Sequence, residues 1–175
     1  MDLRHIVDAC RNGDKNAQST VYNKCWSIIY PSVYLILRNK EEAEDAMQEG
    51  FIKGFKKLSD LKDSGKFIGW QKSICVREAL DRVRKKKNIL LTLSPVVDSA
   101  LVEVEYDHQK DVTIDMIKTG LKTLSEGAQL IIQLHLMEGM THIEIAEQLG
   151  IEHAACRTQY SRALAKLRNN LTLTT

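Results

Sequence analysis

The chain has 175 residues, 43% of them hydrophobic, which is enough for one domain or two small ones, each with a modest core. Only two residues are Pro and nine are Gly, a composition that favours helices. No apolar run reaches membrane-spanning length, and no basic-then-apolar leader follows Met1. We therefore expect a cytoplasmic protein that is neither secreted nor inserted into a membrane.

The four cysteines lie far apart in the sequence and form no C-x-x-C pair: Cys10, Cys25, Cys75 and Cys156. Their spacing indicates neither a disulfide framework nor a zinc site. We expect reduced, mostly buried thiols, and no metal or other cofactor.

The net charge of +2 hides an uneven distribution. Residues 1–87 carry 18 Lys and Arg against 12 Asp and Glu, residues 88–110 carry one against four, and residues 111–175 carry six against seven. The densest basic cluster ends a helical pattern and consists of Arg82, Arg84, Lys85, Lys86 and Lys87. Such a cluster suits a nucleic-acid backbone. It also suits a solvated helix end, where cations favour the helix dipole.

Helical periodicity runs over residues 4–38 with an interruption at Gly13-Asp14, and a further helix is predicted after Asn39. The apolar stripe of this further helix includes Met47, Gly50, Phe51 and Gly54. On a different face of it project Asp45, Gln48 and Glu49. That acidic, amide-bearing face suits a protein partner, and a solvated face near a helix N-terminus is an equally good explanation of the spacing.

The periodicity breaks at residues 58–66 and resumes along residues 66–87, where aromatic residues alternate with cations. The pattern suits single-stranded DNA, because cations follow the phosphates while a ring or pocket accepts an unstacked base. The residues concerned are Lys66, Phe67, Trp70, Lys72, Arg77 and Arg82. Taken alone, Trp70 fits a core anchor better than a stacking platform.

Residues 88–110 lose the periodicity, contain Ser94-Pro95 and have a surplus of acid, which indicates an interdomain linker. The linker contains more apolar residues than an inert spacer would, in the clusters Ile89-Leu90-Leu91 and Val96-Val97. We therefore expect it to lie against a surface when the protein is in a complex. Helices are predicted from Asp111 to about Leu124 and from Ser125 to Met137.

A helix-turn-helix is predicted over residues 138–167. Thr141 and Glu144 form a T-x-x-E capping box that starts the first helix at about His142, and Gly150 stands where the turn requires a left-handed conformation. Apolar residues of the first helix are expected at Ile143, Ala146 and Leu149.

The second helix of this motif has an inner and an outer face. The inner face is expected to bury Cys156, Tyr160, Ala163, Leu164 and Leu167. The outer face presents Ala154, Ala155, Arg157, Thr158, Gln159 and Arg162. Such a face can enter a DNA major groove, although an ordinary helical hairpin would have the same caps and glycines.

Three strings, in the expected order and at the expected separation, resemble the bacterial RNA polymerase sigma factors of the small, two-domain extracytoplasmic-function type. In the first half AEDAMQEGFIKGF is similar to the family's A-E-D-x-x-Q-E-x-F signature, and KFIGWQKSICVREALDRVRKKK is similar to the segment that follows it. In the second half LKTLSEGAQLIIQLHLMEGMTHIEIAEQLGI resembles the family's last conserved region.

The resemblance implies roles for particular positions. Residues implied to bind the clamp helices of the polymerase beta-prime subunit are Asp45, Gln48, Glu49 and Ile52. Residues 60–66 match the loop that captures a flipped base of the minus-ten element, and the implied DNA contacts of the following helix are Lys66, Trp70, Lys72, Arg77, Arg82, Arg84 and Lys85. The implied readers of the minus-thirty-five element are Ala155, Arg157, Thr158, Gln159 and Arg162.

The chain departs from the family pattern at several positions. Gln71 replaces the usual Leu, Arg77 stands in place of Asn, and Glu152-His153 occupies a site where Ser or Thr usually caps the recognition helix. A preferred minus-ten sequence is therefore not implied, and phosphate attraction in the second half is weakened. We expect the C-terminal domain to depend on a further contact, such as the polymerase beta flap or a separate DNA-bound recruiter.

The resulting hypothesis is an all-α protein with a sigma region 2-like domain at 1–87, a linker at 88–110 and a sigma region 4-like helix-turn-helix domain at 111–175. It would act as an alternative sigma factor and not as an enzyme. Its partners would be core RNA polymerase and promoter DNA, and an anti-sigma factor is a further candidate partner. The first alternative is a helix-turn-helix regulator that acts without binding polymerase. The second is a nuclease with acidic metal ligands at Glu41, Glu42, Glu44 and Asp45.

Overall fold

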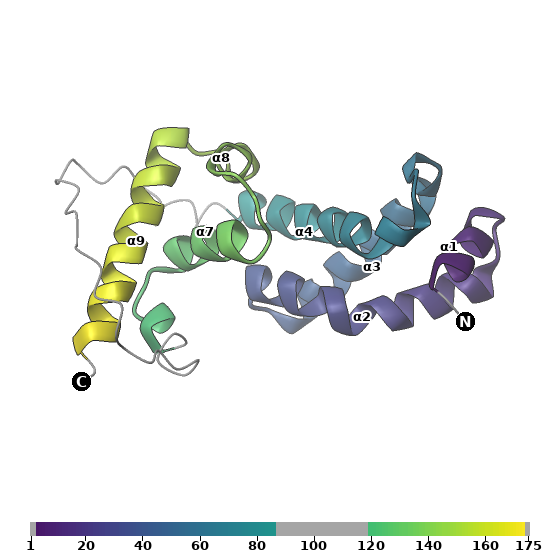
Figure 1. Cartoon of the computed structure of the whole chain (residues 1–175), viewed down its shortest axis with the longest axis horizontal. Helices are drawn as coiled ribbons and strands as arrows, with labels where there is room; N and C mark the ends of the chain where they lie inside the picture. Colours follow the sequence, from purple (N-terminus) through teal and green to yellow (C-terminus); the bar gives the residue numbers. More distant parts are fainter. Residues whose placement is uncertain (1–2, 87–118, 174–175) are drawn as a thin grey trace. The chain divides into compact units, whose positions relative to one another are not determined.

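The computed structural model describes residues 3–86 and 119–173, and every regular element within these two ranges is helical. The chain divides into two compact units, Met1–Lys85 and Lys86–Thr175. The expected linker, and the first part of the helix expected from Asp111, lie outside the described residues. Figure 1 shows the helices of each unit in chain order.

Within its described residues, the first unit has four α-helices, labelled in Figure 1, and two short 3-10 turns. The helices are α1 (Leu3–Arg11), α2 (Lys15–Leu37), α3 (Lys40–Lys56) and α4 (Phe67–Lys85), and the turns are η1 (Leu58–Asp60) and η2 (Ser64–Lys66). Asp14 caps α2 and Asn39 caps α3 through their side chains, so both breaks expected from the sequence are confirmed. At the end of α2 the backbone of Arg38 turns left-handed (φ 51°).

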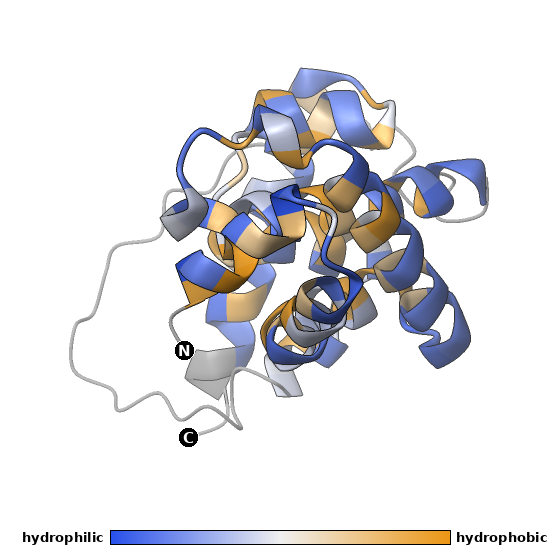
Figure 2. Cartoon of the chain, turned by 90° about the vertical axis from the view of Figure 1, so that its right-hand side faces the viewer, coloured by the Kyte–Doolittle hydropathy of each residue, from blue (hydrophilic) through white to orange (hydrophobic). Residues whose placement is uncertain are grey.

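The core of the first unit lies where α2, α3 and α4 pack on one another. Among its fully buried side chains are Val21, Ile29, Met47, Phe51, Phe67 and Leu80. Figure 2 shows orange hydrophobic segments beside blue hydrophilic ones along the helices of the chain. Each helix therefore buries one stripe and leaves the other available to partners.

The second unit contains the end of a helix at residues 119–122, then α7 (Glu126–Leu136), α8 (His142–Leu149) and α9 (His153–Leu173). One hydrophobic cluster joins α7 to α9 and consists of Leu124, Ala128, Ile132 and Ala163, with Leu121, Tyr160, Leu164 and Leu167 packed against it. Ile131, Leu134, Ile145, Leu149 and Cys156 are also fully buried. Of the inner face expected for α9, Cys156 and Ala163 are buried, and Tyr160, Leu164 and Leu167 are partly buried.

The caps of the hairpin are those that the sequence predicts. The Thr141 hydroxyl accepts from the Glu144 N–H, the Glu144 carboxylate accepts from the Thr141 N–H, and Gly150 ends α8 with φ 68°. One expected apolar position is wrong: Ile143 is 57% exposed, whereas Ile145 is buried. Both residues fit helical spacing, and only the packing of α8 against its neighbours decides between them.

Candidate functional site

Four residues expected to bind a protein partner share one exposed face of α3, which we call the acidic stripe: Asp45, Gln48, Glu49 and Ile52. Their spacing of three and four residues places them on one side of the helix. Ile52 is 54% exposed and supplies an apolar surface beside the acids. A stripe of this composition complements a surface that is basic and partly apolar.

The opposite face of α3 approaches α4 closely, because two of its positions are glycine. A Cβ on Gly50 would lie 2.6 Å from Cys75 Sγ and 3.0 Å from Cys75 Cα, and one on Gly54 would lie 1.9 Å from Gln71 Oε1. Gln71 is fully buried there and donates from Nε2 to the Gly50 carbonyl at 2.9 Å. The glutamine that departs from the family pattern is therefore accommodated by a glycine on the facing helix.

Charged residues link the acidic stripe to α4. Arg82 on α4 places one guanidinium nitrogen 3.0 Å from Glu49 Oε1, and Lys53 pairs with the buried Glu78. Hydrogen bonding to Glu78, and then to Arg82, lowers the pKa of Glu49 below its usual value. Glu49 is therefore held in its charged form.

Arg82, which the resemblance implies as a DNA contact, lies beside acids of α3 and α4 in the structure. Its side chain is 21% exposed and faces carboxylates of α3 and α4, whereas the implied role is a contact with promoter DNA. The reason is helical geometry: residue 82 lies one turn beyond Glu78, on the side of α4 that packs on α3. The sequence shows the cation, but it does not show which acids it meets.

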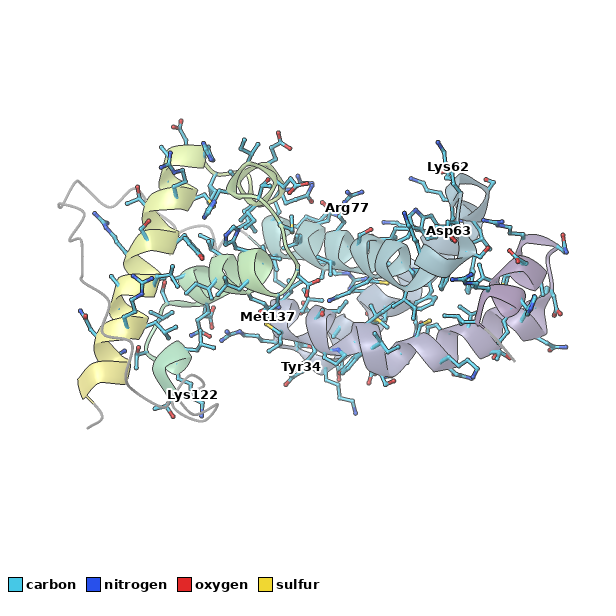
Figure 3. All side chains as sticks on the ribbon, viewed as in Figure 1. Tyr34, Lys62, Asp63, Arg77, Lys122 and Met137 are labelled. Carbon is cyan, nitrogen blue, oxygen red and sulfur yellow. The ribbon has the colours of Figure 1, made fainter. Side chains whose placement is uncertain are left out.

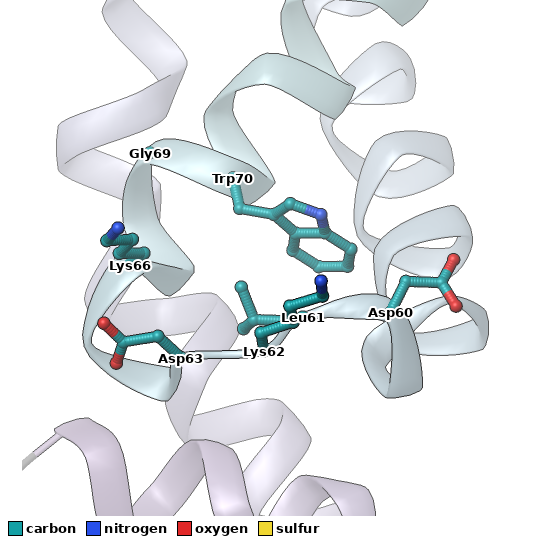
Figure 4. Close-up of a pocket in the computed structure, with 7 residues that line it drawn as sticks. All are labelled: Asp60, Leu61, Lys62, Asp63, Lys66, Gly69 and Trp70. Carbon is teal, nitrogen blue, oxygen red and sulfur yellow. The ribbon is translucent and has the colours of Figure 1, made fainter.

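A pocket of about 570 Å³ opens between the loop after η1 and the start of α4. Figure 4 shows the Trp70 indole over Leu61 and Lys62, with Asp60 on one side and Asp63 and Lys66 on the other. Trp70 is half-buried and its ring also packs against Phe67, with centroids 6.1 Å apart. It therefore combines a core contact with a wall of the pocket, two roles that sequence reasoning had treated as alternatives.

Helix α1 braces the pocket loop, a feature that sequence reasoning missed. Arg11 donates to the Leu61 carbonyl, and the Ser64 hydroxyl donates to Asp8 at 2.5 Å. Within the loop, Asp63 accepts from the Gly65 N–H at 2.8 Å. No local pattern links α1 to residues some 50 positions later, so only the folded chain reveals these contacts.

The other cations expected to contact DNA are spread along α4. Lys66, Arg77, Arg84 and Lys85 are exposed and Lys72 is half-buried. Figure 3 shows Arg77 projecting from α4 and Lys62 projecting from the pocket loop. Arg84 pairs with Asp81 at 2.8 Å, an exposed contact that a phosphate can replace at little cost.

In the second unit, the expected outer face of α9 is partly exposed. Arg157 and Thr158 are exposed, while Ala155, Gln159 and Arg162 are half-buried. The Thr158 hydroxyl donates to the Ala154 carbonyl at 2.9 Å. Glu152 is exposed immediately before the first residue of α9, where its charge meets the positive end of the helix dipole.

Three aromatic rings join α7, α8 and α9. The centroids of His135 and His142 are 4.3 Å apart, and those of both lie within 4.8 Å of the Tyr160 centroid. Burial lowers the pKa of His142, and the neighbouring His135, His153 and Arg157 lower it further. The cluster thus favours a neutral imidazole at the base of the hairpin, and the sequence offers no signal for it.

Among residues 3–86 and 119–173 there is no group of three or more His, Cys, Asp and Glu side chains that could hold a metal ion. All four cysteines are free and buried, as expected. None of the described helices is long and apolar enough to span a membrane.

Comparison with known proteins gives a consistent picture. The family model of sigma-70 region 2 matches residues 20–89, and that of sigma-70 region 4 matches residues 114–167. The chain is 25% identical to the ECF RNA polymerase sigma factor SigW of Bacillus subtilis, over 98% of this chain and 97% of SigW. It is 24% identical to the ECF RNA polymerase sigma factor SigK of Mycobacterium ulcerans, over 97% of this chain and 94% of SigK.

Among solved structures, CnrH in complex with the cytosolic domain of CnrY matches with a TM-score of 0.51 and 19% identity, over 99% of both chains. That likeness supports the fold. Together the two family models cover more than half of the chain, in the order that the sequence strings predict. The chain therefore belongs to the sigma-70 family, as an alternative sigma factor of the extracytoplasmic-function type that directs transcription initiation.

Proposed function

We propose that the acidic stripe of α3 is the surface by which this sigma factor docks on the beta-prime clamp helices of core RNA polymerase. Its four side chains are exposed on one helix face, while the opposite face is fixed against α4. The exposed Ile52 adds an apolar contact at the edge of a charged patch. Residues 1–87 would then form the region 2 domain, which carries polymerase binding.

The pocket beside Trp70 would accept a flipped base of the minus-ten element. An aromatic wall offers stacking, and Lys62 and Lys66 at the rim suit the phosphates on either side of the base. Arg77, Arg84 and Lys85 would extend this contact along the melted strand. Capture of an unstacked base offsets part of the cost of strand separation, so the proposed mechanism uses binding energy and needs no bond-making chemistry.

Residues 111–175 would read the minus-thirty-five element with the outer face of α9, and residues 88–110 would link the two domains. Because residues 111–175 carry six cations and seven acids, we expect this contact to be weak alone. The beta flap of polymerase, or a separate DNA-bound recruiter, would then strengthen it. An anti-sigma factor is a further candidate partner, and work with core polymerase places the chain in the cytoplasm.

One observation carries the proposal: the acidic stripe and the pocket belong to the same compact unit. Helices α3 and α4 are held together by the Gly50–Cys75 contact and by the Arg82–Glu49 ion pair. Polymerase bound to α3 would therefore position the pocket and the cations of α4 against promoter DNA.

The test is competition for core polymerase between this chain and a labelled reference sigma factor. The triple variant Asp45→Ala, Gln48→Ala, Glu49→Ala should lose about tenfold or more in affinity, as expected for the centre of an interface. The control Glu41→Ala removes an exposed acid from the first turn of the same helix and should compete like the wild type. Equal competition by the triple variant, with helical content unchanged, would show that the docking assignment is wrong.

A further inference from the structure

Arg82 crosses from α4 to the acidic stripe on α3. Its Nη2 lies 3.0 Å from Glu49 Oε1, its Nη1 lies 3.9 Å from Asp45 Oδ2, and its Nε lies 3.9 Å from Glu78 Oε1. The exposed fraction of its side chain is 21%, against 49% for Arg84. Arg82 is thus enclosed by three carboxylates, two of which belong to the acidic stripe.

The carboxylates around Arg82 need a cation to remain together. Glu78 is buried, with 8% of its side chain exposed, and Arg82 contacts both its carboxylate and that of Glu49. Charged carboxylates brought this near to each other repel unless positive charge lies beside them. Lys53 supplies one such charge from the end of α3, and Arg82 supplies the second from α4. The planar guanidinium suits this position, because it can donate to several carboxylates at once.

We propose that Arg82 is a positioning residue for polymerase docking: it fixes the Glu49 carboxylate in the orientation that the polymerase meets, and it does not serve primarily as a DNA contact. The inference rests on the proposed docking role of the acidic stripe. A carboxylate can accept up to about four hydrogen bonds, so Glu49 held by Arg82 can still accept from a cation of the partner. A side chain that is already ordered loses less entropy when the partner binds.

If Arg82 acted only through its charge, replacing it with Gln would strengthen polymerase binding, whereas the positioning role predicts weaker binding. Removal of its positive charge makes the stripe more negative, which alone would strengthen attraction to a basic partner. At physiological salt this general attraction is screened over about 8 Å. Salt does not screen the loss of the fixed orientation of the Glu49 carboxylate. We therefore expect weaker polymerase binding as the net result. The direction of the change therefore separates the two roles.

The experiment measures competition for core polymerase by the full-length variant Arg82→Gln. We expect affinity to fall about three- to tenfold, the range that corresponds to ordering one further side chain on binding. The control is Lys40→Gln, which also removes one positive charge from the unit; Lys40 is paired with Glu44 at 3.9 Å, away from Glu49. It should compete within about twofold of the wild type. Unchanged or tighter binding by Arg82→Gln would overturn the inference.

A double-mutant cycle with Glu49→Gln separates this inference from the proposed function. If Arg82 acts through Glu49, Arg82→Gln should cost less than about twofold once Glu49 is already Gln. An equal loss in both backgrounds would overturn the inference. If Glu49→Gln alone has no effect, the docking role of Glu49 is wrong instead. Should Arg82→Gln fail to fold, Arg82→Lys retains the charge beside Glu78, and the same cycle is run from that variant.

Discussion

In the first unit, the candidate functional faces are joined by contacts between residues far apart in the sequence, whereas in the second unit the start of α8 and the turn of the hairpin are set by residues a few positions apart. Arg82 reaches Glu49, and Arg11 reaches the Leu61 carbonyl. In the hairpin, by contrast, Thr141 and Glu144 cap α8 locally and Gly150 makes the turn. The arrangement in the first unit couples the acidic stripe to the pocket beside Trp70. The arrangement in the second unit presents one helix, α9.

The two regions also differ in charge. Residues 1–87 carry 18 cations against 12 acids, while residues 111–175 carry six against seven. Because non-specific DNA affinity grows with the number of phosphates neutralised, the first region is the better electrostatic partner for DNA. We infer a division of labour in which the first unit binds polymerase and the melted strand, and the second adds a weak contact to duplex DNA.

The largest expected effect comes from the contact between α3 and α4. Gly50→Ala should destabilise the protein by about 1–2 kcal/mol, because overpacking costs about 1–3 kcal/mol and the better helix propensity of Ala returns up to about 1 kcal/mol. Gly69→Ala is the matched control within α4, since nothing lies within 4 Å of its added Cβ. That variant should be slightly more stable, by about 0.5–1 kcal/mol. Thermal or urea unfolding measures both, and a stabilising Gly50→Ala would contradict the close approach.

Trp70→Ala should lower transcription from a duplex promoter about tenfold, because stacking on an aromatic ring contributes about 1–3 kcal/mol per base. On a pre-melted bubble template the loss should be below about threefold, since the cost of strand separation is already met there. Transcript yield on the two templates is the measurement. Equal losses on duplex and bubble DNA would remove the pocket from promoter opening.

Thr141→Ala tests how far the second unit depends on local caps. The Thr141 hydroxyl accepts from the Glu144 N–H at 3.2 Å, and losing an N-cap costs about 1 kcal/mol. We expect the free energy of unfolding of the second unit to fall by this amount, and competition of the variant for core polymerase to be unchanged. A comparable loss of polymerase affinity would mean that the second unit itself contributes to polymerase docking, against the division of labour inferred above.

The smallest effect is expected from Glu152→Ser, which removes an acid from the start of α9 and supplies an N-cap. Loss of the anion should raise affinity for promoter duplex about two- to fivefold, in line with a helix-terminus charge effect of about 0.3–1 kcal/mol. Binding titrations of the full chain across a salt series provide the measurement. Tight, steeply salt-dependent binding by the wild-type α9 face would contradict its weak role.

The sequence was most informative where structure depends on neighbouring residues. The helix start after Asn39, the capping box at Thr141 and the left-handed Gly150 follow from local chemistry and are confirmed. Periodicity failed to choose between Ile143 and Ile145, since Ile143 lies at helical spacing from Ala146 and Ile145 at helical spacing from Leu149, and the choice depends on packing. It also could not foresee that Arg82 would meet Glu49, because that pair depends on how two helices cross.

The fold also explains a departure from the family pattern that the sequence alone does not explain. In the sequence, Gln71 is a polar residue where the family usually has Leu. In the structure it fills the space left by Gly54 and donates to the Gly50 carbonyl. Its Oε1 has no hydrogen-bond partner within the described residues. A substitution of this kind becomes predictable only when the facing helix is known.

Run-off transcription with purified core polymerase and mapped start sites tests the central claim most directly, namely that the first unit carries both polymerase docking and strand opening. With the wild-type chain we predict discrete start sites that are absent with core polymerase alone. The Asp45→Ala, Gln48→Ala, Glu49→Ala variant should lose them on duplex DNA, and it should recover when its concentration is raised about tenfold or more, because the defect lies in binding. Wild-type start sites at full strength with that variant, or none with the wild-type chain, would contradict the account.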